Sequence, residues 1–234
     1  MTIFSRRRIL AGTLALPVLG LASNGGLAAP DRYTRITSEP YDIPAIEPGS
    51  VRQDFLRQSV SYSTKYGAGS IVVDPMNRYL YLIQGGGRAL RYGVGVGKAG
   101  FAWSGRARVG RKAQWPRWTP PAAMIQRRPD LAPFSAANGG YPPGPTNPLG
   151  ARALYLFKGS RDTLYRIHGT NEPWSIGQNM SSGCIRMLNH DVIDLYNRVR
   201  VGAPVIVLGN AQPAPQSAGR VRRQHHDRRH RGLY

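Results

Sequence analysis

The sequence of 234 residues contains only one cysteine, Cys184. One cysteine excludes an intramolecular disulfide framework and any zinc or iron–sulfur site that needs several thiolates. Charged residues make up only 19% of the chain, whereas Gly and Pro number 28 and 19. That balance excludes a coiled coil or a helical bundle, which would be rich in Ala, Glu, Lys and Leu. It predicts many short elements joined by turns, in one domain with tails.

Acidic residues are scarce, and lysine is scarcer still. Asp and Glu together number 12 against 32 Lys and Arg residues, which leaves a net charge of +20, and only four of the basic residues are lysines. A charge of this size favours nucleic acid, anionic lipid or an anionic cell-wall polymer as partner. Composition does not choose among them, so the choice depends on where the protein works.

The first 28 residues have the features of an export signal. Arg6, Arg7 and Arg8 directly precede an apolar stretch over 9–21, which is shorter than the ~20 residues that a transmembrane helix needs. Small residues follow at 26–29, as in a cleavable signal, and the paired arginines resemble a twin-arginine signal. The alternative is an N-terminal membrane anchor. We expect a periplasmic or cell-envelope protein with no membrane span after cleavage and no nucleic-acid partner.

The remaining chain divides into three parts. Residues 29–66 carry four prolines and predict an extended lead-in, with one short helix over 51–58. Residues 67–209 have the apolar periodicity of a folded domain. Residues 210–234 are rich in Pro, Arg and His and predict a disordered basic tail.

Within the domain, period-two apolar runs predict a mainly β fold. We expect strands at 70–74, 78–83, 89–96, 153–157, 163–167 and 204–208. The first three are separated by tight turns and predict an antiparallel meander. We also expect two helices, over 119–128 with Thr119 as its cap and over 190–200 with Asn189 as its cap, and a long loop over 129–150.

The candidate chemistry lies between His168 and Cys184. Three of the five histidines are in the tail, so the folded part offers only His168 and His190. The thiolate is the nucleophilic form of cysteine, and an imidazole within reach can take its proton and later protonate a leaving amine. Ser182 and Gly183 precede Cys184 in a turn whose amides could face an oxyanion.

Cys184 and His168 could instead have structural roles. A buried thiol behaves as a small apolar group, and a histidine can be a hydrogen-bonded structural residue. His190 is interpreted as a first-turn helix residue. A metal site of Cys184, His168, His190 and Asp191 matches no usual ligand spacing, so no metal is expected.

The segments 167–171 (Ile-His-Gly-Thr-Asn) and 181–187 (Ser-Ser-Gly-Cys-Ile-Arg-Met) resemble the L,D-transpeptidase catalytic domain of the YkuD type. The resemblance extends from about Ser70 to Leu208. It implies a mixed β-sandwich or barrel-like sheet with two or three short helices. Many members have His before the glycine and Asn two residues after the cysteine, where this chain has Ser182 and Arg186.

The resemblance also implies site residues. Cys184 would be the acyl-accepting nucleophile, His168 its base and acid, and the Gly169 carbonyl would orient the imidazole, while Ser182 and Gly183 would form the oxyanion turn. The candidate substrate-binding residues are Arg186, Asn171 and Trp174. Arg186 is either a carboxylate anchor or a structural arginine. Trp174 and Tyr155 either line a cleft or pack in the core. Glu172 is either a cleft acid or a surface residue, and the surface is expected.

The implied activity is that of a peptidoglycan L,D-transpeptidase, which needs neither metal nor organic cofactor. Cys184 would attack the third residue of a stem tetrapeptide, release D-Ala and pass the acyl group to an amine, which forms a 3–3 cross-link. The alternatives are an L,D-carboxypeptidase, an enzyme that anchors an outer-membrane protein to peptidoglycan, and an inactive wall-binding module.

Overall fold

The structure is a computed structural model and describes residues 31–97, 104–180 and 184–209. The described residues form one mixed sheet of eleven strands in the order β1-β4-β3-β2-β11-β6-β7-β8-β10-β5-β9. The strands are β1 (Gln58–Ser61), β2 (Ile71–Asp74), β3 (Tyr79–Gly85), β4 (Arg88–Gly93), β5 (Gly95–Gly97), β6 (Gly105–Gln114), β7 (Arg152–Lys158), β8 (Arg161–His168), β9 (Asn179–Met180), β10 (Ile185–Arg186) and β11 (Pro204–Val207). The two α-helices are α2 (Ala122–Arg127) and α3 (Asn189–Arg198). The predicted mainly β fold with short helices is confirmed.

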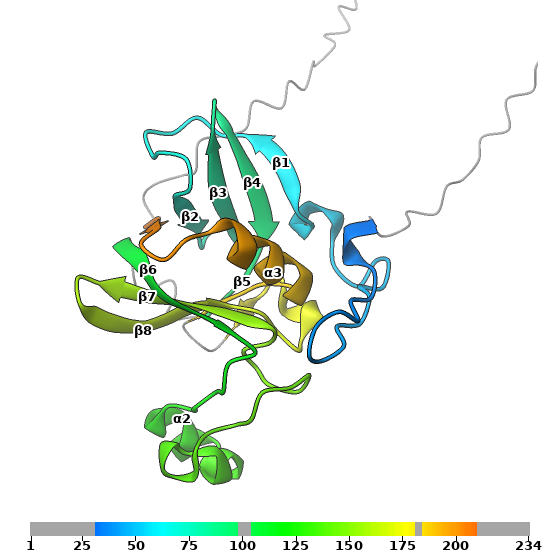
Figure 1. Cartoon of the computed structure of the whole chain (residues 1–234), viewed down its shortest axis with the longest axis vertical. Helices are drawn as coiled ribbons and strands as arrows, with labels where there is room; N and C mark the ends of the chain where they lie inside the picture. Colours follow the sequence, from blue (N-terminus) through cyan, green and yellow to red (C-terminus); the bar gives the residue numbers. More distant parts are fainter. Residues whose placement is uncertain (1–30, 98–103, 181–183, 210–234) are drawn as a thin grey trace, which may run out of the picture.

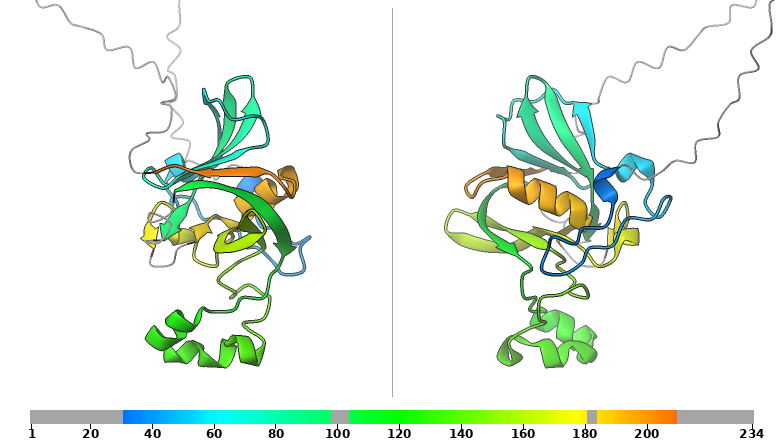
Figure 2. Two further views of the ribbon diagram at one scale, coloured as in Figure 1. Left: turned by 90° about the vertical axis from the view of Figure 1, so that its left-hand side faces the viewer. Right: turned by 45° about the vertical axis from the view of Figure 1, so that its right-hand side comes forward.

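The sheet curls around α3 (Figures 1 and 2). Only Val94 separates β4, near one end of the strand order, from β5, near the other end, so the two ends of the sheet approach each other. Side chains from both halves of the sheet meet one face of α3 in the main core, which includes Val73, Leu154, Ile167 and Leu195, all fully buried. The apolar stripe of α3 therefore fills the concave side of the sheet.

The predicted meander is confirmed, because β2, β3 and β4 pair antiparallel in sequence. The third predicted strand (89–96) is one strand in sequence but two in space: β4 pairs with β3, and β5 pairs with β10. The prediction missed the short strands β1, β9 and β10 and the long strand β6. The ten residues of β6 contain four basic side chains and a bulge between Val109 and Arg111. The bulge breaks the period of two that would identify it.

Neither predicted helix has its predicted cap: α2 begins later than predicted, and α3 begins one residue earlier. Pro121, which has an extended backbone, is the N-cap of α2, so Thr119 is not the cap. Leu188 is the N-cap of α3, and the side chain of Asn189 makes no capping bond. The helix also ends at Arg198, before Gly202. The loop 129–150 contains two 3₁₀ turns, Pro129–Phe134 and Ala136–Asn138, which extend with α2 away from the sheet (Figure 1).

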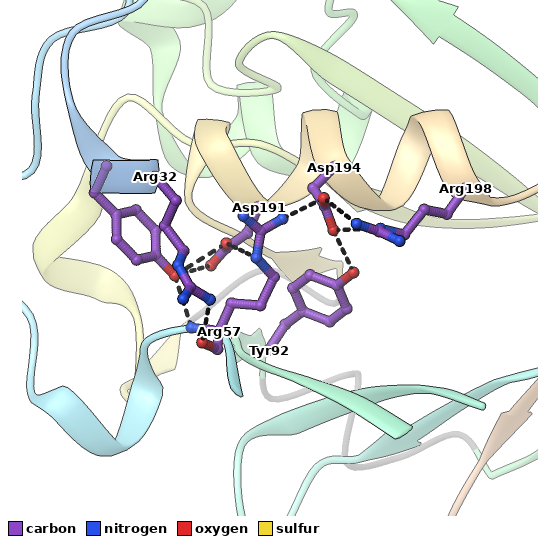
Figure 3. A network of polar contacts seen from close by, with 7 residues as sticks. Arg32, Arg57, Tyr92, Asp191, Asp194 and Arg198 are labelled. Atoms are coloured by element: carbon purple, nitrogen blue, oxygen red, sulfur yellow. Dashed lines mark hydrogen bonds and ion pairs between the residues drawn. The ribbon is translucent and has the colours of Figure 1, made fainter. Parts of the chain in front are cut away.

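The lead-in packs against the domain through a polar network on α3 (Figure 3). The Tyr33 hydroxyl donates to both oxygens of Asp191 at 3.0 and 3.2 Å and accepts the backbone N–H of Arg57 at 2.6 Å. The Arg57 guanidinium is 2.5 Å from Asp194, to which the Tyr92 hydroxyl also donates. These contacts connect the lead-in with β4 and α3.

A second anchor holds the lead-in to the sheet. Glu39 accepts hydrogen bonds from both terminal nitrogens of Arg152 at 2.9 and 2.5 Å and from Trp115 Nε1 at 2.9 Å. The helix predicted over 51–58 is reduced to one 3₁₀ turn, Gln53–Phe55, because β1 begins at Gln58. The predicted export signal and basic tail lie outside the described residues. Among the helices of the described ranges, none has the length and apolar character that crossing a bilayer requires.

Candidate active site

Two adjacent parallel strands, β8 and β10, bring His168 and Cys184 onto one face of the sheet. Ile185 in β10 pairs with Ile167 in β8, and Arg186 pairs with His168. Both isoleucines point into the core, so Arg186 and His168 point to the opposite face. Cys184 directly precedes β10, level with Arg166, and shares this outer face. From strand spacing and rise, the Cα atoms of Cys184 and His168 are on the order of 8 Å apart, a separation that their side chains can bridge.

The His168 ring is buried and held by its own backbone neighbour. Only 4% of the residue is exposed, and Nδ1 donates to the Gly169 carbonyl oxygen over 2.6 Å. A carbonyl only accepts, so Nδ1 carries the proton and Nε2 is the unprotonated nitrogen of the neutral ring. Burial, and next the positive charge of Arg186, lower the pKa of His168 to about 4. The imidazole is therefore neutral at physiological pH.

Cys184 is half-buried. Burial raises the pKa of the Cys184 thiol, although a backbone hydrogen bond from Arg166 and the charges of Arg166 and Arg186 act in the opposite direction. A raised thiol pKa beside a lowered imidazole pKa favours the neutral pair over a thiolate–imidazolium pair. The arrangement suits removal of the thiol proton by Nε2 as the sulfur attacks, which is general-base catalysis.

Asn189 positions the Gly169 segment, a role that replaces the predicted cap. Its side-chain oxygen accepts the Ala151 N–H at 3.0 Å, and its amide donates to the Thr170 carbonyl at 3.0 Å. A Cβ on Gly169 would overlap Asn189 Oδ1, so only glycine allows this close approach. Sequence reasoning missed Asn189 because these partners are 19 and 38 residues away.

Asn147 organises the loop that contacts His168 through Pro148. This side chain is fully buried, donates to the carbonyls of Pro116 and Pro142 at 3.0 and 2.8 Å, and accepts the Leu149 N–H at 2.9 Å. The neighbouring Pro148 backbone also acts on the His168 ring, where it raises the pKa and so partly offsets burial. The loop therefore contributes a backbone contact that favours the protonated imidazole.

Arg186 is paired within the protein. Its Nη1 is 2.6 Å from Glu172 Oε2, and the Arg186 side chain is only 15% exposed. Glu172 was expected on the surface, and its side chain is 41% exposed. The structure adds that this carboxylate pairs with Arg186, whose charge acts on His168.

The other candidate residues are dispersed. Asn171 donates to the Thr146 carbonyl at 3.1 Å and lines a cavity of about 140 Å³ against the lead-in. Trp174 is 59% exposed, so core packing is excluded for it. Tyr155 lies on the outer face and is stacked between Arg111 and Arg166. Ser182 and Gly183, the predicted oxyanion turn, lie outside the described residues. Within the described ranges, no three His, Cys, Asp or Glu side chains converge as a metal site requires.

Comparisons with known proteins place this site in a family. The profile described as "YkuD: L,D-transpeptidase catalytic domain" matches residues 68–207. The chain is similar to "Probable L,D-transpeptidase YbiS" of Escherichia coli (strain K12), with 34% identity over 142 residues, which cover 58% of this chain and 43% of that protein. It is also similar to "Putative L,D-transpeptidase in ATP synthase subunits region ORF 5" of Fuscovulum blasticum, with 36% identity over 104 residues, 44% of this chain and 49% of that protein.

Among solved structures, one from Brucella melitensis, described as a probable carnitine operon oxidoreductase, has 48% sequence identity. The match covers 68% of this chain and 97% of that one, with a TM-score of 0.47. A TM-score this low supports no inference about function. The chain spans less than half the length of the two curated relatives named above. Because the profile matches more than half of the chain, this protein belongs to the family of YkuD-type L,D-transpeptidase catalytic domains.

Proposed function

We propose that the protein is an exported peptidoglycan L,D-transpeptidase with Cys184 as nucleophile and His168 as its base and acid. The supporting observation is the pairing of β8 with β10, which puts both residues on one face of the sheet in a chain of this family. The neutral state of both groups defines the first step. Nε2 of His168 accepts the thiol proton while the sulfur attacks a carbonyl carbon.

The substrate would be a peptidoglycan stem tetrapeptide, attacked at the carbonyl of its third, L-configured residue. The C–N bond to the terminal D-Ala breaks, and the imidazolium of His168 gives its proton to the departing amine. The thioester on Cys184 retains the acyl group, so its transfer to an amine needs no ATP. The amine of a second stem then attacks, His168 takes the proton that this amine loses, and the thiol receives a proton as it is released. No step requires a metal or an organic cofactor.

Ser182 and Gly183 would supply backbone N–H groups to the oxyanion, and the loss of one such donor typically costs ~3 kcal/mol. The choice of acceptor depends on loops around the thioester. Water in place of the amine gives an L,D-carboxypeptidase, and an outer-membrane protein gives an anchoring enzyme. The twin-arginine route and the periplasmic location belong to the same proposal, since peptidoglycan lies there.

The direct test is covalent labelling followed by product analysis. We expect the intact mass of the purified protein to increase by the mass of one bound carbapenem. Cys184→Ala should abolish this increase. Digested sacculi should then contain new 3–3 cross-links. Tripeptides alone would indicate a carboxypeptidase, and wall-linked protein would indicate anchoring. An unlabelled wild-type protein, with wall binding unchanged by Cys184→Ala, would instead identify an inactive binding module.

A further inference from the structure

A row of four residues crosses the outer face of the sheet and ends at the candidate nucleophile. Arg111 in β6 pairs with Tyr155 in β7, and Tyr155 pairs with Arg166 in β8. Continuing the register of β8 and β10 by one residue puts Arg166 level with Cys184, and the Arg166 backbone and charge act on the Cys184 thiol. Residues that face each other across a sheet point to the same side, so the four side chains form one continuous row.

Tyr155 is held between the two arginines of this row. The guanidinium of Arg111 lies 3.6 Å from the centre of the Tyr155 ring, and that of Arg166 lies 4.4 Å from it. Tyr155 is 8% exposed, so its ring is a rigid platform. Stacking on such a ring favours arginine and fixes the plane of its guanidinium.

The two arginines differ in charge compensation. Arg166 makes a bidentate pair with Asp162, at 2.7 Å through Nη1 and 2.9 Å through Nη2. Arg111 is exposed and has no hydrogen bond or ion pair with any residue in the ranges that the structure describes. Arg186, the other cation near His168, is paired with Glu172. The charge of Arg111 does act on Asp162, where it helps to lower the pKa of that carboxyl. Arg106 is another exposed arginine of β6. Arg111 is the one whose guanidinium is held in the row that ends at Cys184.

We propose that Arg111, held on Tyr155, is a specificity-determining residue that binds a carboxylate of the acyl donor. A guanidinium presents a planar pair of donors that a carboxylate accepts bidentately. This inference rests on the proposed function, because it names a contact of the same donor peptide. It assigns this role to Arg111 in place of Arg186, because Nη1 of Arg186 is already bonded to Glu172 and the Arg186 side chain is only 15% exposed.

The spacing decides which carboxylates can be reached. The guanidinium lies above β7, two strands from Cys184, which is on the order of 10 Å in the plane of the sheet. A hydrogen bond of about 3 Å leaves roughly 7 Å between the bound carboxylate and the thiol. A carboxylate at the end of the third residue's side chain fits this distance, as in a diamino dicarboxylic acid. The terminal carboxylate of the leaving D-Ala is the other source on the same peptide.

The test compares three synthetic donor peptides with one amine acceptor and the full-length protein. The first donor has both carboxylates, the second has a carboxamide on the third residue's side chain, and the third has a C-terminal amide. We expect Arg111→Gln to reduce kcat/KM for the first donor by roughly 10-fold to 100-fold, as for lost hydrogen bonds between charged groups. For the donor in which an amide replaces the bound carboxylate, Arg111→Gln and the wild type should have the same kcat/KM. That donor identifies which carboxylate Arg111 binds.

Arg106→Gln is the matched control, because it removes the same charge from another exposed position of β6. It should keep the wild-type preference, and both variants should have the wild-type melting temperature. An equal loss on all three donors, or no loss, in Arg111→Gln would overturn the inference and leave the proposed function intact. Failure of the wild-type protein to process any donor would refute the proposed function itself.

Discussion

Nδ1 of His168 donates a hydrogen bond to the carbonyl oxygen of the next residue, Gly169, over 2.6 Å. The ring is therefore oriented by the backbone, where many catalytic histidines are oriented by a carboxylate. A neutral carbonyl stabilises an imidazolium less than a carboxylate does. Burial and the nearby arginines consequently dominate the pKa of His168.

The first prediction concerns the pH dependence of Cys184 acylation. Nε2 must be unprotonated to accept the thiol proton, and the pKa of His168 is lowered to about 4, so the rate should fall only as the pH approaches about 4. Above that region it should be flat. The measurement is the carbapenem acylation rate of the wild-type protein across this range. A rise centred near the ordinary histidine pKa of about 6.5 would contradict the neutral-pair mechanism.

The second prediction is that Arg186→Gln moves the acidic limb of the pH–rate profile, the fall of the Cys184 acylation rate at low pH, to higher pH. The positive charge of Arg186 is the second largest cause of the lowered pKa of His168, so its removal should raise that pKa. The acylation rate should then begin to fall at a higher pH than in the wild type. Arg106→Gln, distant on β6, is the control and should leave the limb in place. An unchanged limb in Arg186→Gln would exclude this electrostatic coupling.

The third prediction concerns Gly169, whose Cβ position overlaps Asn189 Oδ1. Gly169→Ala should destabilise the protein by about 1–3 kcal/mol, as overpacking does, and should displace the carbonyl that orients His168. We expect acylation to slow by more than the fraction of unfolded protein explains. Gly67→Ala is the control, because no atom lies within 4 Å of its Cβ position. Wild-type stability in urea denaturation of Gly169→Ala would disprove the proposed close packing.

The fourth prediction uses the network of Figure 3. Burial raises the pKa of the Asp191 carboxyl to about 7, although the charge of Arg57 and the hydrogen bond from Tyr33 act in the opposite direction. Between its ordinary value of 3.8 and about 7, the unfolded chain has lost this proton and the native protein keeps it. The Asp191 contribution to stability therefore falls as the pH rises through this window.

Asp191→Asn removes this titration while keeping the shape of the side chain. The stability of the variant relative to the wild type should thus improve from pH 4 towards pH 7, as measured by urea denaturation at several pH values. Asp54→Asn, at an exposed carboxylate that pairs with Arg52, is the control for general charge effects. A stability difference between Asp191→Asn and the wild type that does not change with pH would contradict the raised pKa.

Much of the fold follows from local patterns. The β-branched run in β2 and the alternation in β3 identify strands without knowledge of their partners. The period-two alternation of apolar residues did not identify β6, because arginines and a bulge interrupt it there. It also did not show the break at Val94, where one extended segment contributes to two distant parts of the sheet. The roles of Cys184 and His168 remain predictions from the sequence, and their placement on one face is compatible with them.

The sequence by itself determined which residues are the candidates for the chemistry, because Cys184 is the only thiol, few histidines are available, and each lies in a short motif segment. Only the tertiary structure decided what surrounds them. Arg186 pairs with Glu172, Asn189 holds the Gly169 segment, and Arg111 joins the row that ends at Cys184. Each of these relations depends on strand register and on the closure of the sheet around α3. Those are set by the packing of the whole core, so no local pattern encodes them.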